Sequence, residues 1–162
     1  MSADWEQDEV VELVCQMDDM TGESLRVLMD RCLAVGVRDV FATPICMKKG
    51  RMGYMLTVLA KVEQQDQMIE ALLSWSTTAG VRYRTMTRAK AHVGFTTVQL
   101  PEGEVVVKEY TAGDVFKIKP ESDDVRRLVE QTGASYESLS QRVQTAYWLA
   151  REAGCTQGVL EE

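Results

Sequence analysis

The side chains best suited to binding chemistry occur in three short clusters that are far apart in the sequence. They are an acidic pair, a basic trio and a run of hydroxyl groups: Asp18 and Asp19; Lys48, Lys49 and Arg51; and Ser76, Thr77 and Thr78. Carboxylates bind Mg²⁺ or Mn²⁺ through hard oxygen atoms, and such a metal bridges phosphate oxygens. Lys, Arg and hydroxyl groups neutralise or hydrogen-bond the oxygens that the metal leaves. The three clusters together have the makeup of a metal–nucleoside triphosphate site.

The elements that must position these clusters follow from the spacing of apolar residues. Alternation predicts strands, and a three-to-four residue spacing predicts helices. The predicted order is strand 10–17, a helix that ends at Gly36, strand 37–47, strand 54–62, helix 65–75 and strand 81–90. This βαββαβ order is typical of a ferredoxin-like sandwich, so the fold class is α+β.

The predicted topology brings the three clusters to one edge of the sheet. In a right-handed βαβ unit the first two strands are parallel, so both end at the same edge. The first strand ends at Asp18 and the second runs into Lys48. The third strand and second helix return the chain, so the loop that begins at Ser76 lies at this edge too. The first helix also starts here, with free N–H groups and a positive dipole end.

The last strand of the sandwich carries a basic stripe on one face. Its members are Arg82, Arg84, Arg88 and Lys90. Such a stripe in an acidic chain is consistent with a surface for an anion or an acidic partner. Charged residues also protect an edge strand against aggregation, and the sequence does not separate the two interpretations. Arg82, beside the hydroxyl run, is counted among the nucleotide-binding candidates.

The rest of the chain is predicted to be a smaller appendage. A hairpin of strands 96–100 and 104–109 is followed by a strand over 114–119. A helix with Ser122 as N-cap ends near Gly133, and a last helix covers 135–153. We therefore expect a ferredoxin-like domain with the metal–nucleotide edge over residues 1–90, and a β-hairpin and C-terminal helical appendage over 91–162. The tail after Gly154 is expected to be mobile.

Composition excludes several classes of protein. The chain has 162 residues and a net charge of −7, which argues against broad nucleic-acid binding. No apolar stretch approaches the length of a membrane span, so we expect no membrane partner. The four cysteines are scattered without a CxxC pair, which favours a reducing cytoplasm over a disulfide framework. Half-open sheets of this kind often associate, so we expect a homo-oligomer.

Each cluster also has a purely structural interpretation. Asp19 or Thr21 could simply cap the first helix. Because side chains alternate along a strand, the two aspartates could face opposite ways, leaving one as the metal ligand. The lysine pair alone would be a solvated turn, and the hydroxyl run alone would be turn chemistry. His92, the single histidine, is expected to be structural. No residue is assigned as catalytic.

Three stretches of the sequence resemble the C-terminal part of the LarC family. They are Asp18-Asp19-Met20-Thr21-Gly22-Glu23, the segment from Asp39 to Lys49, and Thr77-Thr78-Ala79-Gly80-Val81-Arg82. The stretch Lys117-Ile118-Lys119-Pro120-Glu121 and the following Arg126-Arg127-Leu128 are similar to it as well. Cys15-Gln16-Met17, Arg51-Met52-Gly53 and Trp75-Ser76 depart from the family pattern, whereas the Asp, Lys and Thr pairs are kept.

The resemblance implies a CTP-dependent cyclometallase, a lyase-type chelatase. Such an enzyme inserts nickel into pyridinium-3,5-bisthiocarboxylic acid mononucleotide to make the nickel–pincer nucleotide of lactate racemase. CTP with Mg²⁺ or Mn²⁺ would be bound and hydrolysed, with nickel as a substrate of the full-length enzyme. The family's N-terminal histidine-rich portion is not in this sequence, so the chain is expected to be the nucleotide-binding domain of an incomplete enzyme.

Two competing classes follow from the fold alone. A ferredoxin-like sandwich could be a small-molecule-binding regulatory module without catalysis, which would not need the convergence of Asp, Lys and Thr. It could also be an RNA-binding sheet, but the middle strands lack the paired aromatic side chains that stack bases. Titration with CTP in the presence and absence of Mn²⁺ separates the three classes.

Overall fold

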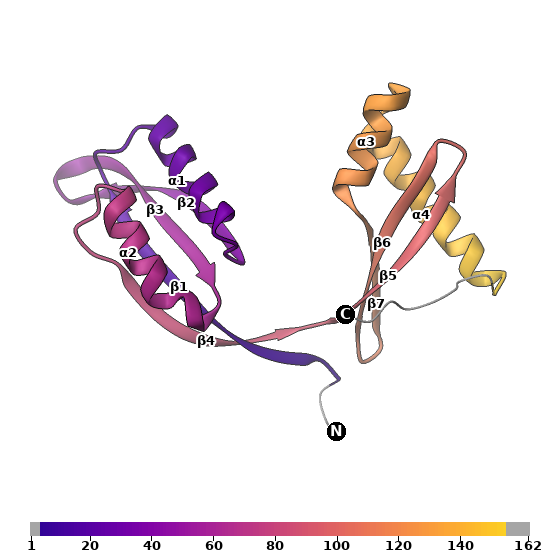
Figure 1. Ribbon diagram of the computed structural model, residues 1–162, viewed down its shortest axis with the longest axis horizontal. Helices are drawn as coiled ribbons and strands as arrows, with labels where there is room; N and C mark the ends of the chain where they lie inside the picture. Colours follow the sequence, from indigo (N-terminus) through magenta and orange to yellow (C-terminus); the bar gives the residue numbers. More distant parts are fainter. Residues whose placement is uncertain (1–3, 155–162) are drawn as a thin grey trace. The chain divides into compact units, whose positions relative to one another are not determined.

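The computed structural model describes residues 4–154, and the chain divides into two compact units (Figure 1). One unit spans Gln7–Arg88. The other contains the chain from Ala89 onward together with the residues that precede Gln7. Each unit has a hydrophobic core of its own. The tail after Gly154, which is predicted to be mobile, lies outside the described residues.

The Gln7–Arg88 unit is built on a four-stranded sheet with strand order β2-β3-β1-β4. Its elements are β1 (Glu6–Met17), α1 (Gly22–Ala34), β2 (Asp39–Met47), the 3-10 turn η1 (Lys48–Gly50), β3 (Arg51–Ala60), the 3-10 turn η2 (Val62–Gln64), α2 (Gln65–Trp75) and β4 (Arg82–Lys90). β3 pairs antiparallel with both β1 and β2, so β1 and β2 point the same way. The predicted α+β, ferredoxin-like βαββαβ order is confirmed.

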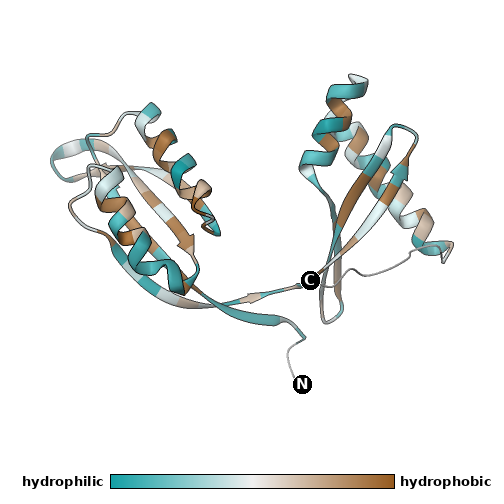
Figure 2. Ribbon diagram, viewed as in Figure 1, coloured by the Kyte–Doolittle hydropathy of each residue, from teal (hydrophilic) through white to brown (hydrophobic). Residues whose placement is uncertain are grey.

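Alternate side chains of β1 point into the core of this unit. Val11, Leu13, Cys15 and Met17 are buried, and they pack with Leu25, Leu28 and Cys32 of α1 and Met68 and Leu72 of α2. Both helices cover the same face of the sheet (Figure 1). Burial raises the pKa of both core thiols, Cys15 and Cys32, to about 11. Figure 2 shows the apolar residues along the middle strands and the inner sides of the helices.

The second unit is a three-stranded antiparallel sheet with strand order β5-β6-β7 and two helices on one face (Figure 1). Its elements are β5 (His92–Leu100), β6 (Gly103–Ala112), β7 (Val115–Pro120), α3 (Ser122–Thr132) and α4 (Tyr136–Glu152). Leu139, Val143 and Tyr147 of α4 are fully buried against this sheet, as the spacing of apolar residues predicts.

Two local predictions are corrected by the structure. The predicted N-cap of α3, Ser122, is wrong: Glu121 holds that position, and Ser122 is the first helical residue. The third strand runs over Arg51–Ala60 and not over 54–62, because residues 62–64 turn into η2 before α2. Within the described residues, no helix is both long and apolar enough to cross a membrane.

Candidate functional site

The end of β1 lies against the start of β3, and a glycine makes this approach possible. Met17 pairs with Tyr54, and Met47 at the end of β2 pairs with Arg51. A Cβ atom at Gly53 would stand 2.4 Å from the carbonyl oxygen of Met17, closer than real Cβ contacts. Any larger residue at this position would push the ends of β1 and β3 apart. The loops that follow β1 and β2 therefore meet at one edge of the sheet.

Asp18 is held by the basic cluster at this edge. The Nη1 atom of Arg51 donates a hydrogen bond to Oδ2 of Asp18 at 2.9 Å, and the two groups form an ion pair. This bond is the largest cause that holds the pKa of Asp18 below its ordinary value, and the charge of Lys48 acts in the same direction. Asp18 is therefore a carboxylate at neutral pH, as a metal ligand must be.

Asp19 is held by the third cluster. The hydroxyl of Thr77 donates a hydrogen bond to Oδ1 of Asp19, although the two residues are 58 positions apart. The Thr78 hydroxyl donates to the carbonyl of Gly80 at 3.0 Å and lies 3.5 Å from the carbonyl oxygen of Gln16 in β1. The loop after α2 is thus joined to the end of β1 at two points.

Ser76 has a local structural role. Its hydroxyl donates to the carbonyl of Leu72 at 2.6 Å in the last turn of α2 and accepts from the backbone N–H of Thr78 at 3.2 Å. The turn interpretation therefore holds for Ser76, because its hydroxyl already donates one hydrogen bond and accepts another within the turn. Thr77 is the member of the hydroxyl run whose side chain reaches the acidic pair.

Lys48 and Lys49 occupy the exposed turn between β2 and β3. Lys49 has φ of +64°, which makes it the one non-glycine residue with positive φ among residues 4–154, and Gly50 follows with φ of +71°. The left-handed conformation is unfavourable for a side-chain-bearing residue, and such positions cluster at functional sites. No hydrogen bond within the described residues involves either ammonium group, so both charges point to solvent.

The structure separates two readings of the acidic pair. Thr21 is the N-cap of α1, and its side chain accepts from the backbone N–H of Ser24 at 3.1 Å. Asp18 and Asp19 are therefore not needed as caps. Their side chains contact different neighbours, Arg51 and Thr77, in the bend that follows Met17, the last residue of β1.

The basic stripe of β4 is largely neutralised by carboxylates on β1. Ion pairs join Arg84 to Glu12 at 2.8 Å, Arg88 to Asp8 at 2.6 Å and Lys90 to Glu6 at 2.6 Å. For these three residues the structure favours the edge-strand interpretation over an anion surface. Arg82 differs, because its Nη1 atom lies 3.4 Å from the neutral side-chain oxygen of Gln16. It begins β4 beside the hydroxyl run and keeps its place among the candidates.

Sequence reasoning missed Gln16 and Gly53. Gln16 lies on the outward face of β1 and contacts both Arg82 and the Thr78 hydroxyl. Gln16 stands four residues after Glu12, so the two side chains lie on the same face of β1, and this spacing is visible in the sequence. The role of Gly53 depends on a close backbone approach that only the pairing of β1 with β3 reveals.

His92 is not at this edge. It is nearly half exposed in the second unit, where its ring lies 3.3 Å from Glu6 and 3.6 Å from Asp4. Among residues 4–154 there is no group of three or more His, Cys, Asp or Glu side chains that could hold a metal by itself. The structural role of His92 stays a prediction.

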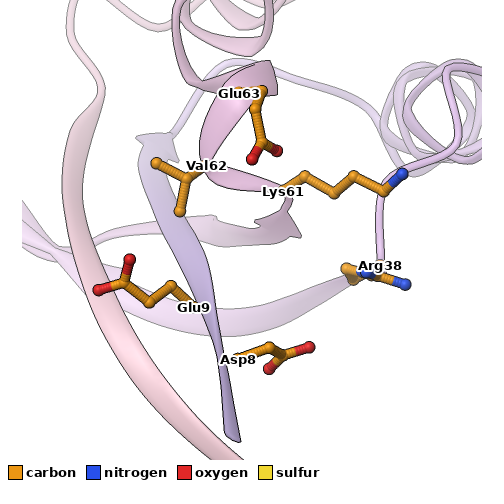
Figure 3. A pocket seen from close by; sticks show the side chains of 6 residues that line it. All are labelled: Asp8, Glu9, Arg38, Lys61, Val62 and Glu63. Carbon is orange, nitrogen blue, oxygen red and sulfur yellow. The ribbon is translucent and has the colours of Figure 1, made fainter.

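A pocket of about 570 Å³ lies at the opposite end of the same strands (Figure 3). Its lining mixes both signs of charge: Asp8, Glu9, Arg38, Lys61, Val62 and Glu63. It is bounded by the start of β1 and the turn after β3, whereas the candidate edge lies where β1 ends. None of the predicted site residues lines it.

Comparison with known proteins identifies the family of the chain. The family model described as nickel insertion protein matches residues 1–140. The chain belongs to the nickel insertion protein family. It is 40% identical over 134 residues to the pyridinium-3,5-bisthiocarboxylic acid mononucleotide nickel insertion protein of Lactiplantibacillus plantarum, covering 83% of this chain and 32% of that protein. A putative nickel insertion protein of Syntrophotalea carbinolica is 34% identical over 151 residues, covering 92% of this chain and 38% of that one.

Solved structures lead to the same family. The apo form of LarC2, described as the C-terminal domain of a cyclometallase involved in the synthesis of the NPN cofactor of lactate racemase, matches with a TM-score of 0.84 and 38% identity. The match covers 88% of this chain and 99% of that one. Protein MK0293 from Methanopyrus kandleri shares the fold at a TM-score of 0.59 and 22% identity. The chain spans about a third of the length of the curated relatives above.

Proposed function

We propose that this chain is the nucleotide-binding domain of a nickel insertion enzyme that acts on pyridinium-3,5-bisthiocarboxylic acid mononucleotide. In this proposal the edge formed by the ends of β1 and β2 and the loop after α2 binds CTP together with Mg²⁺ or Mn²⁺. CTP hydrolysis would drive insertion of nickel, which is a substrate. The names of the relatives support this reaction, and the geometry of the edge supports a nucleotide-binding role for this domain.

One observation carries the proposal: each aspartate of the pair is bonded to a different remote cluster. Arg51 reaches Asp18 and Thr77 reaches Asp19, so three loops that are distant in sequence meet at two adjacent carboxylates. Structural capping does not account for the pair, because Thr21 caps α1. The same edge presents two exposed lysines, Lys48 and Lys49, that form no ion pair or hydrogen bond with a carboxylate among the described residues.

The donor set fits Mg²⁺ or Mn²⁺ better than nickel. Mg²⁺ is commonly held by one or two carboxylates together with substrate phosphates, and it keeps several waters. Two aspartates at an exposed edge match this pattern, with the triphosphate completing the coordination. Nickel favours imidazole and softer ligands, and the described residues contain no cluster of such groups. The metal would neutralise phosphate charge and fix the triphosphate in place.

The protein's own residues then have distinct tasks. Asp18 and Asp19 hold the metal, while Lys48, Lys49 and Arg82 neutralise phosphate oxygens. Arg51 is the counter-ion of Asp18 in the free protein. A divalent metal held by Asp18 would supply positive charge there, and the Arg51 guanidinium would then be placed to bind a phosphate, to which Arg binds in bidentate fashion. The hydroxyl of Thr77 donates to Asp19 and that of Thr78 to the Gly80 carbonyl, so these two residues would orient Asp19 and the loop beside the triphosphate, and Ser76 holds that loop against α2.

Calorimetric titration with CTP tests the proposal. We expect saturable binding with Mn²⁺ and little binding with excess EDTA. Asp18→Asn and Asp19→Asn keep side-chain size but remove a charge, so each is expected to lower Mn²⁺-dependent affinity at least tenfold while the melting temperature changes little. Asp30→Asn is the matched control, because Asp30 is also an exposed partner of an arginine, Arg26, on the outside of α1. Equal affinity with and without EDTA, or parental affinity in both site variants, would refute the metal–triphosphate edge.

A further inference from the structure

The second unit has an exposed sheet face that combines aromatic and basic side chains. In β5-β6-β7, alternate residues such as Val98, Val107 and Ile118 pack toward α3 and α4. The other parity therefore faces away from the helices. On that face lie Phe95 of β5, Lys108 and Tyr110 of β6, and Lys117 and Lys119 of β7.

The register of the strands places these five side chains in one compact group. Lys108 pairs with Phe95 on one side and with Lys119 on the other. Tyr110 pairs with Lys117, and it is a diagonal neighbour of Phe95 at a separation of roughly 7–8 Å. Phe95 is 38% exposed and Tyr110 is half-buried. Two aromatic rings thus lie directly beside a row of lysines.

The charges of this face are only partly neutralised. Lys108 forms an ion pair with Glu121, which raises the pKa of its ammonium group. Lys117 and Lys119 are exposed, and neither has an ion-pair partner among residues 4–154. The arginines of β4 are different, because carboxylates on the adjacent strand neutralise them. The two free lysines of β7 are therefore an anion-binding feature that the fold leaves unpaired.

The size and the positive charge of this face indicate which kind of ligand it could bind. The unpaired ammonium groups of Lys117 and Lys119 could bind one phosphate. The rings of Phe95 and Tyr110 could bind one aromatic heterocycle, because aromatic side chains stack on bases and attract positively charged rings to their faces. A net charge of −7 disfavours a long polyanion such as RNA but not a single nucleotide.

We propose that the exposed face of β5-β6-β7 binds one pyridinium mononucleotide, with the ring against Phe95 and Tyr110 and the phosphate between Lys117 and Lys119. This inference rests on the proposed function, since it gives the mononucleotide substrate a binding surface of its own. The metal–triphosphate edge lies in the other unit and shares no residue with it. The two sites can therefore be tested independently.

The test is a proton NMR titration of the described chain with nicotinic acid mononucleotide as the probe. Stacking predicts saturable upfield shifts of the probe's pyridinium protons. The double variant Lys117→Ala/Lys119→Ala should raise the dissociation constant at least about tenfold, because it removes two charged contacts. Phe95→Leu should reduce the upfield shifts. Arg126→Ala is the control, since it removes an exposed positive charge from α3 in the same unit.

Each outcome decides the matter. Loss of probe binding in the lysine variant, with Mn²⁺-dependent CTP affinity unchanged, supports the proposal. If CTP fails to bind the parent while the probe still does, the triphosphate edge fails and this surface stands. Absence of saturable shifts, an equal loss in Arg126→Ala, or tighter lysine-dependent binding of a single-stranded oligonucleotide overturns the mononucleotide surface. Circular dichroism of each variant confirms that the unit remains folded.

Discussion

Replacement of Lys49 separates backbone strain from ligand binding at the turn between β2 and β3. Lys49 has φ of +64°, in the left-handed region. That conformation costs a residue with a Cβ atom roughly 1–2 kcal/mol, and glycine is free of the cost. Glycine loses roughly 0.5–1 kcal/mol more backbone entropy on folding. Lys49→Gly is therefore expected to leave stability unchanged or to raise it by up to about 1.5 kcal/mol.

The same substitution is expected to weaken binding of the metal–triphosphate. Loss of a hydrogen bond to a charged group costs roughly 1.5–3 kcal/mol, which corresponds to an affinity loss of about 10- to 150-fold. Lys49→Ala is the matched variant, because it removes the charge and keeps the unfavourable φ. We expect both variants to lose CTP affinity alike, while only Lys49→Gly keeps or gains stability relative to Lys49→Ala.

Chemical denaturation gives the stabilities, and calorimetry with CTP and Mn²⁺ gives the affinities. If Lys49→Gly is less stable than Lys49→Ala, the turn is not strained as described. If both variants bind CTP like the parent, Lys49 is not a phosphate ligand and its unusual conformation serves only the turn.

Three further predictions concern stability, cysteine reactivity and nickel. Asp124→Ala removes the acceptor of the Val106 N–H bond and should cost roughly 1–3 kcal/mol at neutral pH. That bond lowers the pKa of Asp124, so its stabilisation is present above the ordinary pKa of 3.8 and is lost as the pH falls through the folded-state pKa. The free energies of unfolding of the parent and the variant, measured between pH 7 and pH 2.5, should therefore converge at low pH. In a Cys155→Ser background, a thiol reagent should label exposed Cys46 quickly and buried Cys15 and Cys32 only on unfolding, and early labelling of three thiols would contradict the core. Equilibrium dialysis should show weak nickel binding without nucleotide, and tight stoichiometric uptake would contradict the donor-set argument.

Elements with strong apolar periodicity were predictable from the sequence. Alternation along β1 and the helical spacing of α2 identified both elements, and α2 has the predicted bounds of Gln65–Trp75. Boundaries set by tertiary contacts were not predictable. Thr57, which is buried within β3, and the early start of that strand at Arg51 depend on pairing with both neighbouring strands.

The meeting of the acidic pair with Arg51 and Thr77 could be anticipated from topology alone. Strand direction decides which ends share an edge, and the βαββαβ order determines strand direction. The partner of each side chain could not be anticipated. Gly53 allows the close approach of the end of β1 to the start of β3, beside which Arg51 bonds to Asp18, and no local pattern encodes such an approach. The bond between Thr77 and Asp19 joins residues 58 positions apart.

The two basic strands illustrate why a run of charge in a sequence does not by itself locate an anion site. Arg84 of β4 and Lys117 of β7 both stand in alternating basic patterns, and from the sequence they look alike. They differ in the residue that the neighbouring strand places beside each of them. Glu12 of β1 forms an ion pair with Arg84, so the charge of Arg84 is neutralised within the sheet. β6 presents Tyr110 opposite Lys117, and an aromatic ring leaves the ammonium charge available to a ligand. An unpaired cation beside an aromatic ring thus depends on strand register, which is why the surface proposed for the mononucleotide could be found only from the paired sheet.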